Sequence, residues 1–260
     1  MDLSNGGRRA VDGDRAKFGE ISRFIVRALK ARFRDHRAEL AIIKQHISSN
    51  GIACDIGANK GSFVYWLSRW CPRGRVVAFE PQEQLAHRLA NVCATIRLDN
   101  VRVEAVAVHS GSGIQELFIP EGHQPGASLY RGASQNESFS VVSVPVVSLD
   151  QYFDEKDQIS VLKVDVEGAE LGVFHGAERI LRQNSPLLVF ECENRHLDRV
   201  TVRDVFSFLE NLGYKGQFVF RNRLHPLAAF SEIVHQRQDG PWFWKQKDYC
   251  NNFVFSKTAA

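Results

Sequence analysis

Hydrophobic and polar positions follow a helical period near the start of the chain. From Phe18 to Ile47, apolar residues recur three or four positions apart, with basic residues between them. This spacing places the apolar side chains on one stripe of a helix. It predicts one long or two shorter amphipathic helices that end at Asn50 and Gly51. The arginines on the polar face fit either a solvated surface or a surface that meets an anionic substrate or partner.

After residue 51 the hydrophobic pattern changes. Short apolar runs rich in β-branched residues alternate with helical patterns, which is typical of a parallel sheet covered by helices on both faces. The predicted strands span residues 52–56, 75–80, 101–108, 160–165, 186–192, 214–220 and 249–255. The predicted helices span residues 61–70, 82–95, 169–183 and 201–212. We therefore predict an N-terminal helical extension over residues 1–50 and one α/β catalytic domain over residues 51–260.

Two irregular segments interrupt this alternation. Residues 120–138 are rich in Gly, Ser, Pro and Asn within a predicted β-hairpin over residues 109–147, and residues 221–248 are rich in aromatic side chains. Segments of this kind are often lids or binding loops. Residues 221–248 contain no clear helix, whereas a parallel neighbour for the last strand would need a helical crossover. The sequence therefore predicts a seven-stranded, mostly parallel sheet with an antiparallel last strand.

Composition and charge narrow the class of protein. The chain has 260 residues, of which 44% are hydrophobic and 24% charged, as in ordinary folded domains. Its 33 basic and 30 acidic residues give a net charge of +3, so we expect no nucleic-acid partner. Residues 1–50 hold 11 Lys and Arg against 6 Asp and Glu. The basic character therefore belongs to the N-terminal extension.

The cysteines and the apolar runs bear on location. No run approaches the roughly 18 consecutive apolar residues that a membrane span needs, and residues 1–16 lack the apolar stretch of a secretory signal. The five cysteines are scattered and include no C-x-x-C pair, so we expect neither a disulfide framework nor a zinc site. These features predict a cytoplasmic protein without a membrane span. The sequence leaves a monomer and a homo-oligomer open.

A glycine-rich turn follows the first predicted strand. It reads D-x-G-x-N-x-G, contains Asp55, Gly57, Asn59 and Gly61, and leads into a helix. Glycine lets a ligand approach the backbone, and the helix start offers free amide groups. Glu80 ends the next strand, about 20 residues on, where an acidic residue binds ribose hydroxyls in nucleotide-binding folds. These residues predict an adenosyl site; the alternative is a turn that only packs helix on strand.

The order of residues in this turn favours one adenosyl ligand. Asp55 stands before the first glycine, so the pattern differs from G-x-G-x-x-G. A carboxylate at this position would repel a pyrophosphate, but it would attract the ammonium group of S-adenosylmethionine directly or through water. Asn59 adds a neutral polar contact. We therefore expect S-adenosylmethionine rather than NAD or FAD.

Carboxylates also end two later strands. Asp165 closes the strand at 160–165, on the same face as Lys163, and Glu167 falls at the turn into the next helix. The carboxyl edge of a parallel sheet is where open α/β folds bind ligands, which favours a functional interpretation of both acids. Glu170 is the weaker candidate, because an acidic residue in the first turn stabilises a helix without any ligand.

The strand at 186–192 ends in a second polar group. Glu191, Glu193 and His196 follow its apolar run, and Glu191 and Glu193 would converge with Asp165 if this strand neighbours the one at 160–165. Such a cluster could bind a divalent cation, hold a substrate hydroxyl or pair with nearby basic residues. His196 is the histidine that we consider as a base.

Together these motifs resemble those of the FkbM-type methyltransferases. The resemblance covers about residues 51–256 and rests on D-x-G-A-N-x-G at 55–61, A-F-E-P at 78–81, S-L-D at 148–150, L-K-V-D-V-E-G-A-E at 162–170 and the strand ending in Glu191. It implies a Rossmann-like class I methyltransferase fold and S-adenosylmethionine as the methyl donor. It also implies methyl transfer to a hydroxyl, commonly on sugars, glycolipids or polyketide-like products.

The sequence thus predicts an O-methyltransferase acting on a small-molecule or glycan hydroxyl. The predicted cofactor-binding residues are Asp55, Gly57, Asn59, Gly61 and Glu80. An aliphatic hydroxyl is a poor nucleophile and benefits from a base, and the candidate catalytic residues are Asp165, Glu167, Glu191 and His196. A divalent metal stays open, with candidate ligands Asp165, Glu191 and Glu193. The alternatives are an NAD(P)-dependent Rossmann oxidoreductase and a non-catalytic nucleotide-binding module of the same fold.

Overall fold

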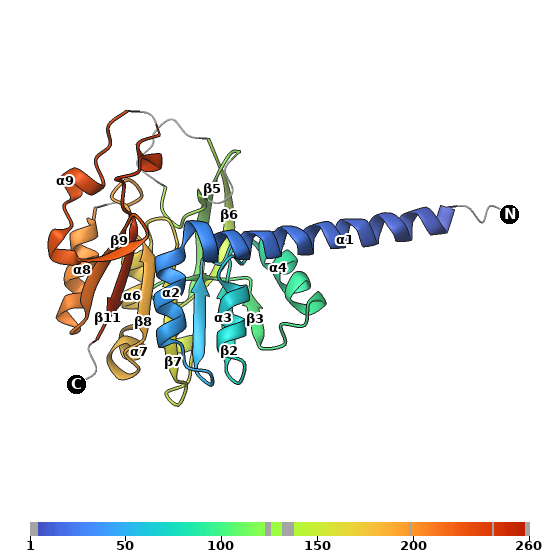
Figure 1. Ribbon diagram of the computed structural model, residues 1–260, viewed down its shortest axis with the longest axis horizontal. Helices are drawn as coiled ribbons and strands as arrows, with labels where there is room; N and C mark the ends of the chain where they lie inside the picture. The colour runs from blue at the N-terminus through green and yellow to red at the C-terminus, as the bar shows by residue number, and fades with distance from the viewer. Residues whose placement is uncertain (1–4, 123–125, 132–137, 198, 241, 258–260) are drawn as a thin grey trace.

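An eight-stranded sheet forms the centre of the protein (Figure 1). The computed structural model describes residues 5–122, 126–131, 138–197, 199–240 and 242–257, without the side chains of residues 5–17. The strand order is β10-β9-β11-β8-β7-β1-β2-β3. The strands are β1 (Ile52–Ile56), β2 (Arg75–Phe79), β3 (Val101–Glu104), β7 (Ile159–Val164), β8 (Leu187–Glu191), β9 (Lys215–Phe220), β10 (Arg223–Pro226) and β11 (Asn252–Ser256).

The strand directions confirm the predicted fold class. Strands β3, β2, β1, β7 and β8 pair in parallel, and β11 runs antiparallel to both of its neighbours, β8 and β9. The order of the parallel strands reverses at β1, which has β2 on one side and β7 on the other. In open α/β sheets a ligand binds beside such a reversal, outside the carboxyl ends of the strands.

The predicted count of seven strands is wrong by one. Residues 221–248 were expected to be an irregular connection, but they include β10, which forms a hairpin with β9. The turn consists of Arg221 and Asn222, both with left-handed backbone, at φ 49° and 59°. Two such residues form the tight turn that suits a hairpin, yet the usual signal is a glycine after the asparagine or aspartate. Because that glycine is missing, the turn could not be recognised from the sequence.

Helices cover both faces of the sheet. One face carries α1 (Asn5–Lys30), the π-helix η1 (Ala31–Asp35), α2 (Arg37–His46), α3 (Val64–Trp70) and α4 (Glu83–Thr95). The other face carries α5 (Leu149–Tyr152), α6 (Glu170–His175), α7 (Glu178–Gln183) and α8 (Val202–Asn211). Short helical turns η3 (Leu227–Ala229), α9 (Glu232–His235) and η4 (Phe243–Lys245) lie between β10 and β11.

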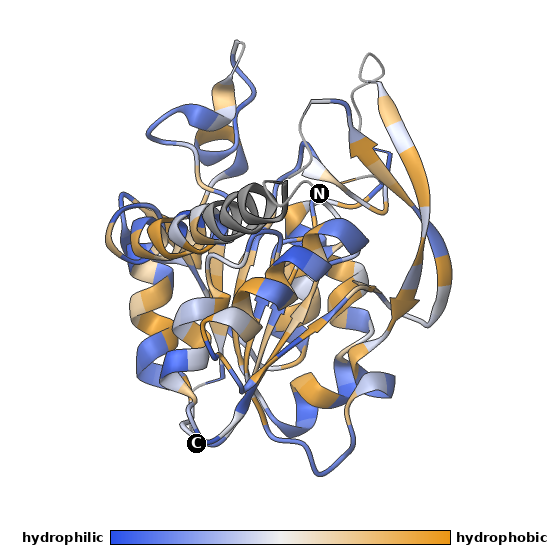
Figure 2. Cartoon of the chain, turned by 90° about the vertical axis from the view of Figure 1, so that its right-hand side faces the viewer, coloured by the Kyte–Doolittle hydropathy of each residue, from blue (hydrophilic) through white to orange (hydrophobic). Residues whose placement is uncertain are grey.

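Alternate strand residues enter the two halves of the core. Ala53 of β1 and Val161 of β7 pack with Leu40 of α2, whereas the next residue of β1, Cys54, packs in the cluster that contains Phe174 of α6. All five residues of β1 are buried, as expected of a parallel strand with helices on both faces. Figure 2 shows hydrophobic residues concentrated along these central strands.

The predicted helix over residues 169–183 is two helices, α6 and α7, with Gly176 and Ala177 between them. A Cβ atom added to Gly176 would lie 2.1 Å from the backbone oxygen of His109, so only glycine fits beside that passing segment. The interruption therefore depends on a residue far away in the sequence, and the helical period of the segment did not reveal it.

The N-terminal helices pack against the domain at their C-terminal part. Phe24 of α1 and Ile43 of α2 are buried in the core, whereas the start of α1 projects away from the sheet (Figure 1). Helix α1 begins at Asn5, earlier than the predicted Phe18, and α2 ends at His46 rather than at Asn50. The division at residue 51 stays a prediction. Among the described helices, none combines the length and the apolar composition needed to cross a bilayer.

The predicted hairpin over residues 109–147 forms a second, smaller sheet. Strands β5 (Gly113–Pro120) and β6 (Phe139–Val147) pair antiparallel, and β4 (Ala107–Val108) joins β6 in parallel. In the irregular segment between β5 and β6, residues 123–125 and 132–137 lie outside the described residues, whereas residues 126–131 are described.

All five cysteines are buried free thiols. The cytoplasmic location that their pattern suggests stays a prediction.

Candidate functional site

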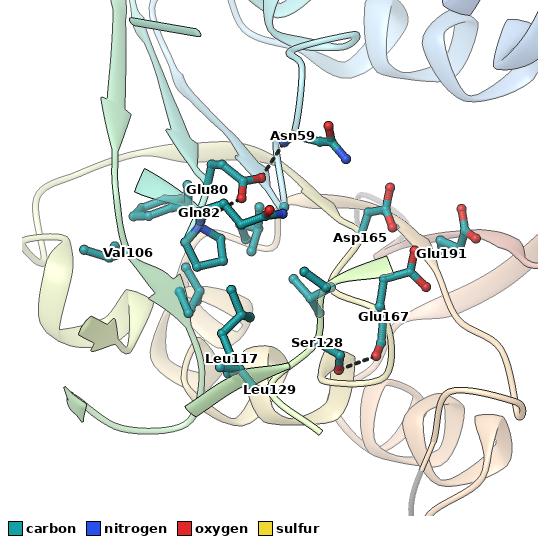
Figure 3. Close-up of a pocket in the computed structure, with 18 residues that line it drawn as sticks. Asn59, Glu80, Gln82, Val106, Leu117, Ser128, Leu129, Asp165, Glu167 and Glu191 are labelled. Carbon is teal, nitrogen blue, oxygen red and sulfur yellow. Dashed lines mark hydrogen bonds between the residues drawn. The ribbon is translucent and has the colours of Figure 1, made fainter. Parts of the chain in front are cut away.

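A pocket opens at the carboxyl edge of the sheet, beside β1 (Figure 3). The space between its lining atoms, open solvent included, is about 730 Å³. Its walls come from the ends of β1, β2, β7 and β8, from β4 and β5, and from residues 127–129. Of the ten predicted site residues, six line it: Gly57, Asn59, Glu80, Asp165, Glu167 and Glu191.

The glycine turn forms one wall because its backbone passes very close to β7. Gly57 has φ 75°, and a Cβ atom there would lie 1.8 Å from the backbone oxygen of Asp165. A side chain at this position is therefore excluded by space as well as by conformation. Gly61, at φ 74°, also has no room for a side chain, because a Cβ atom there would lie 2.4 Å from the side chain of Leu89 in α4. The two glycines hold the turn against the sheet and against α4.

Glu80 is fixed at the end of β2 by two backbone groups. Its carboxylate accepts hydrogen bonds from the N–H of Asn59 at 2.8 Å and from the N–H of Gln82 at 2.9 Å. Burial raises the pKa of Glu80, and these two hydrogen bonds act in the opposite direction. Each carboxylate oxygen keeps a further lone pair, so Glu80 can still accept hydrogen bonds from a ligand in the pocket.

Asp55 lies behind the pocket, where it binds Lys163. The ammonium of Lys163 is 3.2 Å from Asp55, 3.3 Å from Asp165 and 3.4 Å from the carbonyl oxygen of Gly57. Burial opposes the charge on Lys163, but the two carboxylates outweigh it and raise the pKa of the ammonium. Burial in turn raises the pKa of Asp55, against the attraction of Lys163. This buried lysine links β1, β7 and the glycine turn.

Glu167 and His196 form an ion pair at the pocket wall. Nε2 of His196 lies 2.8 Å from Oε2 of Glu167, and Glu167 faces the pocket whereas His196 does not line it. Burial acts against the charged ring, but the hydrogen bond and the charge of Glu167 raise the pKa of His196. His196 therefore holds the carboxylate of Glu167 from behind.

Glu191 and Glu193 share a hydrogen bond, and their pKa values move in opposite directions. Burial, followed by repulsion from Asp165 and Glu167, raises the pKa of Glu191 well above its usual value. Burial also opposes ionisation of Glu193, but the guanidinium of Arg195 and the proton of Glu191 lower the pKa of Glu193 to about 2. Glu191 is thus the acid of the pair on which burial and neighbouring charges favour the protonated form, and it lines the pocket.

The predicted metal ligands do not form a common ligand set. Glu193 does not line the pocket, and its carboxylate accepts hydrogen bonds from Arg195, Tyr249 and Asn251. Within residues 5–257, less the undescribed positions, no group of three or more His, Cys, Asp or Glu side chains is placed to hold a metal ion. The pairing with a nearby basic residue, which the sequence left open, is the arrangement that Glu193 adopts.

Residues 127–129 close the pocket on the side opposite the glycine turn. Ser128 donates a hydrogen bond from Oγ to the carbonyl oxygen of Glu167 at 2.6 Å, and it accepts one from the N–H of Tyr130 at 3.1 Å. Ala127 and Leu129 contribute apolar surface. The segment therefore joins the second sheet to the acidic wall.

Several lining residues were not predicted. They are Ile56, Phe79, Pro81, Gln82, Val106, Ala107, Val108, Leu117, Ala127, Ser128, Leu129 and Val166. Pro81 and Gln82 directly follow Glu80 and could have been found from the predicted carboxyl edge. Ala127, Ser128 and Leu129 lie in the irregular segment 120–138, which the sequence marked as a candidate lid or binding loop. Val106, Ala107, Val108 and Leu117 had no such signal, because their approach to the main sheet depends on tertiary packing.

Comparisons with known proteins fit this geometry. The model of the family described as methyltransferase FkbM domain matches residues 55–215. The chain is also 30% identical over 200 residues to the methyltransferase sdnD of Sordaria araneosa. This alignment spans 65% of the chain and 75% of that protein.

Two solved structures share the fold. Methyltransferase FkbM from Methylobacillus flagellatus has a TM-score of 0.51 and 16% identity, covering 80% of this chain and 44% of that one, so the chain spans less than half of that protein. SMU.1697c from Streptococcus mutans, solved in complex with SAH, also has a TM-score of 0.51, with 12% identity over 85% of this chain and 96% of that one.

Proposed function

Because the chain belongs to the FkbM methyltransferase family, we propose that it transfers a methyl group from S-adenosylmethionine to a hydroxyl oxygen of a sugar, a glycolipid or a secondary metabolite. The family match spans residues 55–215, which include the glycine turn and Asp165 and Glu167 of the acidic wall. The comparisons give no support to an NAD(P)-dependent oxidoreductase or to a non-catalytic nucleotide-binding module.

The pocket fits S-adenosylmethionine at the end formed by β1 and β2. Oδ1 of Asn59 is buried without a hydrogen-bond partner in the described part of the chain, so it is available to a donor group of the ligand. Glu80 binds the ribose hydroxyls, and the bare backbone of Gly57 lets the ligand approach closely. Asp55 is a positioning residue, since it acts on the turn through Lys163. When bound, S-adenosylmethionine supplies a methyl group on a positively charged sulfur atom.

The acidic wall orients the acceptor and takes its proton. Asp165 and Glu167 are the proposed catalytic residues, because both line the pocket and their side chains are 34% and 17% exposed. The carboxylate of Asp165 would accept the hydroxyl proton as the acceptor oxygen takes the methyl group, while the methyl–sulfur bond breaks and S-adenosylhomocysteine leaves. Glu167 accepts a hydrogen bond from a second acceptor group, and His196 holds it in place. Glu191 contributes a further polar group to the same wall.

Most of the rate enhancement in this proposal comes from alignment. Methyl transfer from a sulfonium is an in-line displacement, and well-oriented reactions reach effective molarities of about 10⁵ to 10⁸ M. The single observation that carries the proposal is the placement of Glu80 and Asp165 in one pocket, at opposite sides of the glycine turn (Figure 3).

The test combines ligand binding with an acceptor screen. S-Adenosylmethionine and SAH should raise the melting temperature and NAD should not; the reverse result overturns the proposal. A panel of hydroxylated sugars, glycolipids and secondary metabolites, incubated with methyl-labelled donor, should yield a product whose label lies on oxygen. Repeating the reaction with a chelator decides whether a metal ion takes part.

A further inference from the structure

A second pocket lies between α1, the glycine turn and α4. It encloses about 570 Å³ and is lined by Glu20, Arg23, Phe24, Arg27, Asn59, Lys60, Leu85, Arg88, Leu89 and Val92. Asn59 lines both this pocket and the proposed cofactor pocket, so the two are direct neighbours. The proposed function assigns no role to this second pocket.

Four cations converge on this pocket from three separate elements. Arg23 and Arg27 come from α1, Lys60 from the glycine turn and Arg88 from α4, whereas Glu20 is the single acid in the lining. Within the part of the chain that the structure describes, none of the four cations makes an ion pair or a side-chain hydrogen bond. An excess of three positive charges therefore faces the pocket.

Some surface arginines of this protein are paired with acids. Arg182 binds Glu178 at 2.7 Å, Arg203 binds Glu232 at 3.1 Å, and Arg221 binds Asp248 at 3.1 Å. Three of the cations around the second pocket, Arg23, Lys60 and Arg88, are exposed, and each of them alone would be an ordinary surface residue. Their convergence with Arg27 is what distinguishes the pocket from a solvated surface.

The guanidinium of Arg27 gives the strongest indication that the second pocket binds an anion. Its Nε atom is buried without a hydrogen-bond partner in the described chain, and a buried donor left unpaired is costly. Arg23 lies one helical turn away, and like charges four residues apart destabilise a helix. Burial, and then repulsion from Arg23, lower the pKa of Arg27. An anion in the pocket would relieve both effects.

The pocket also has an apolar floor. Phe24, Leu85 and Leu89 are buried there, and a Cβ atom on Gly61 would lie 2.4 Å from Leu89 and 2.9 Å from Phe24. The floor thus packs directly against the glycine turn, and the basic side chains surround it. This combination suits a ligand that carries an anionic group on an apolar or ring-shaped body.

We propose that this second pocket binds a phosphate or carboxylate group, with Arg27 and Arg88 as its main ligands. The anion accepts hydrogen bonds from the two guanidinium groups, including Nε of Arg27, while Lys60 and Arg23 contribute charge. The anion belongs either to the methyl acceptor or to the amino-acid end of S-adenosylmethionine; this choice of source rests on the proposed function, whereas the anion site itself does not.

Inorganic phosphate is the probe for the site. Thermal shift is measured over a phosphate series at constant ionic strength, so that general salt effects cancel. Wild type should show saturable stabilisation, and Arg27→Gln and Arg88→Gln should each bind phosphate about tenfold or more weakly, since each loses a charge-assisted hydrogen bond. Lys247→Gln removes the same charge from an exposed position outside the pocket and should behave as wild type. Equal phosphate binding in wild type and in both pocket variants overturns the proposal, whether or not the protein transfers methyl groups.

Cofactor binding separates the two sources. If the anion belongs to the acceptor, Arg88→Gln keeps the wild-type affinity for S-adenosylmethionine, and phosphate still binds the cofactor-saturated protein. If the anion is the cofactor's carboxylate, Arg88→Gln weakens S-adenosylmethionine, and saturating cofactor displaces phosphate. Both results support an anion site, whereas absence of phosphate binding to the cofactor-free protein contradicts it.

Discussion

The imidazole of His196 lies behind the carboxylate of Glu167, with 2.8 Å between Nε2 and Oε2. The turn before α6 makes this contact possible. Glu167 has a left-handed backbone at φ 52°, and the next residue, Gly168, has φ 104°. A Cβ atom on Gly168 would lie 2.3 Å from the backbone oxygen of His196, so glycine is required for the two segments to meet. The conformation of this turn therefore sets the position of an acid in the pocket.

The first prediction concerns the titration of His196. Because the charge of Glu167 raises the pKa of His196 above the usual 6.5, Glu167→Gln should lower that pKa. Proton NMR over a pH series measures the change. His109 provides an internal control, since burial lowers its pKa without any contribution from Glu167. An unchanged His196 titration in the variant would contradict the ion pair.

The ion pair between Glu167 and His196 also predicts how the free energy of unfolding changes with pH. A group whose folded pKa is raised stabilises the fold fully below its unfolded pKa, here about 6.5, and the effect is lost as pH rises through the folded value. As pH rises from 6 to the raised pKa of His196, the free energy of unfolding should therefore fall more in wild type than in Glu167→Gln. Chemical denaturation at several pH values checks this difference.

A second prediction concerns Glu80 and the methyl donor. Glu80→Ala removes the carboxylate at the end of β2, and charge-assisted hydrogen bonds are worth roughly 1.5 to 3 kcal/mol. The affinity for S-adenosylmethionine should fall about 10- to 150-fold by calorimetry. Glu83→Ala, an exposed acid at the start of α4, should leave it unchanged. Unaltered affinity in Glu80→Ala would remove Glu80 from the cofactor site.

A third prediction separates chemistry from structure at Asp165. Asp165→Asn keeps the size of the side chain but removes its basicity, so kcat should fall about 10²- to 10⁴-fold while the affinity for S-adenosylmethionine changes little. Lys163 keeps its second carboxylate partner, Asp55, so the melting temperature should stay close to wild type. Asp154→Asn, at an exposed position, is the control. Full turnover in Asp165→Asn would make this residue a structural partner of Lys163.

A fourth prediction uses the buried carboxyl of Glu170. Burial raises the pKa of Glu170 to about 7 from 4.5, although Oε1 accepts a hydrogen bond from the N–H of Gly168 at 3.0 Å. A raised folded pKa means that stability is present at low pH and is lost as pH rises through about 7. Glu170→Gln keeps the acceptor oxygen but cannot ionise.

Relative to wild type, Glu170→Gln should therefore gain stability between pH 5 and pH 9, by up to about 3 kcal/mol. Denaturant titrations at both pH values measure the gain. Glu155→Gln, an exposed acid, should show no such dependence. A difference between Glu170→Gln and wild type that does not vary with pH would show that Glu170 is not protonated by burial.

The sequence by itself determined the elements whose signals are local. The period of apolar residues identified the central strands and most helices, because burial on a sheet or a helix face imposes that period on every element. The glycine turn was also visible in the sequence, since a close approach between backbone segments demands glycine at fixed positions. That this turn and Glu80 bind the cofactor stays a prediction. The missing crossover before β11 revealed its antiparallel direction.

Tertiary structure decided what depends on pairing between distant residues. Asp55 was expected to meet the cofactor, yet only the folded chain placed Lys163 beside it. Glu193 was a candidate metal ligand, and the arrival of Arg195, Tyr249 and Asn251 around it gave it a different partner set. Opposite charges attract over a few ångströms whatever their separation along the chain. Tertiary packing therefore decides which acidic residues keep an unpaired carboxylate, and the spacing of residues along the sequence does not reveal it.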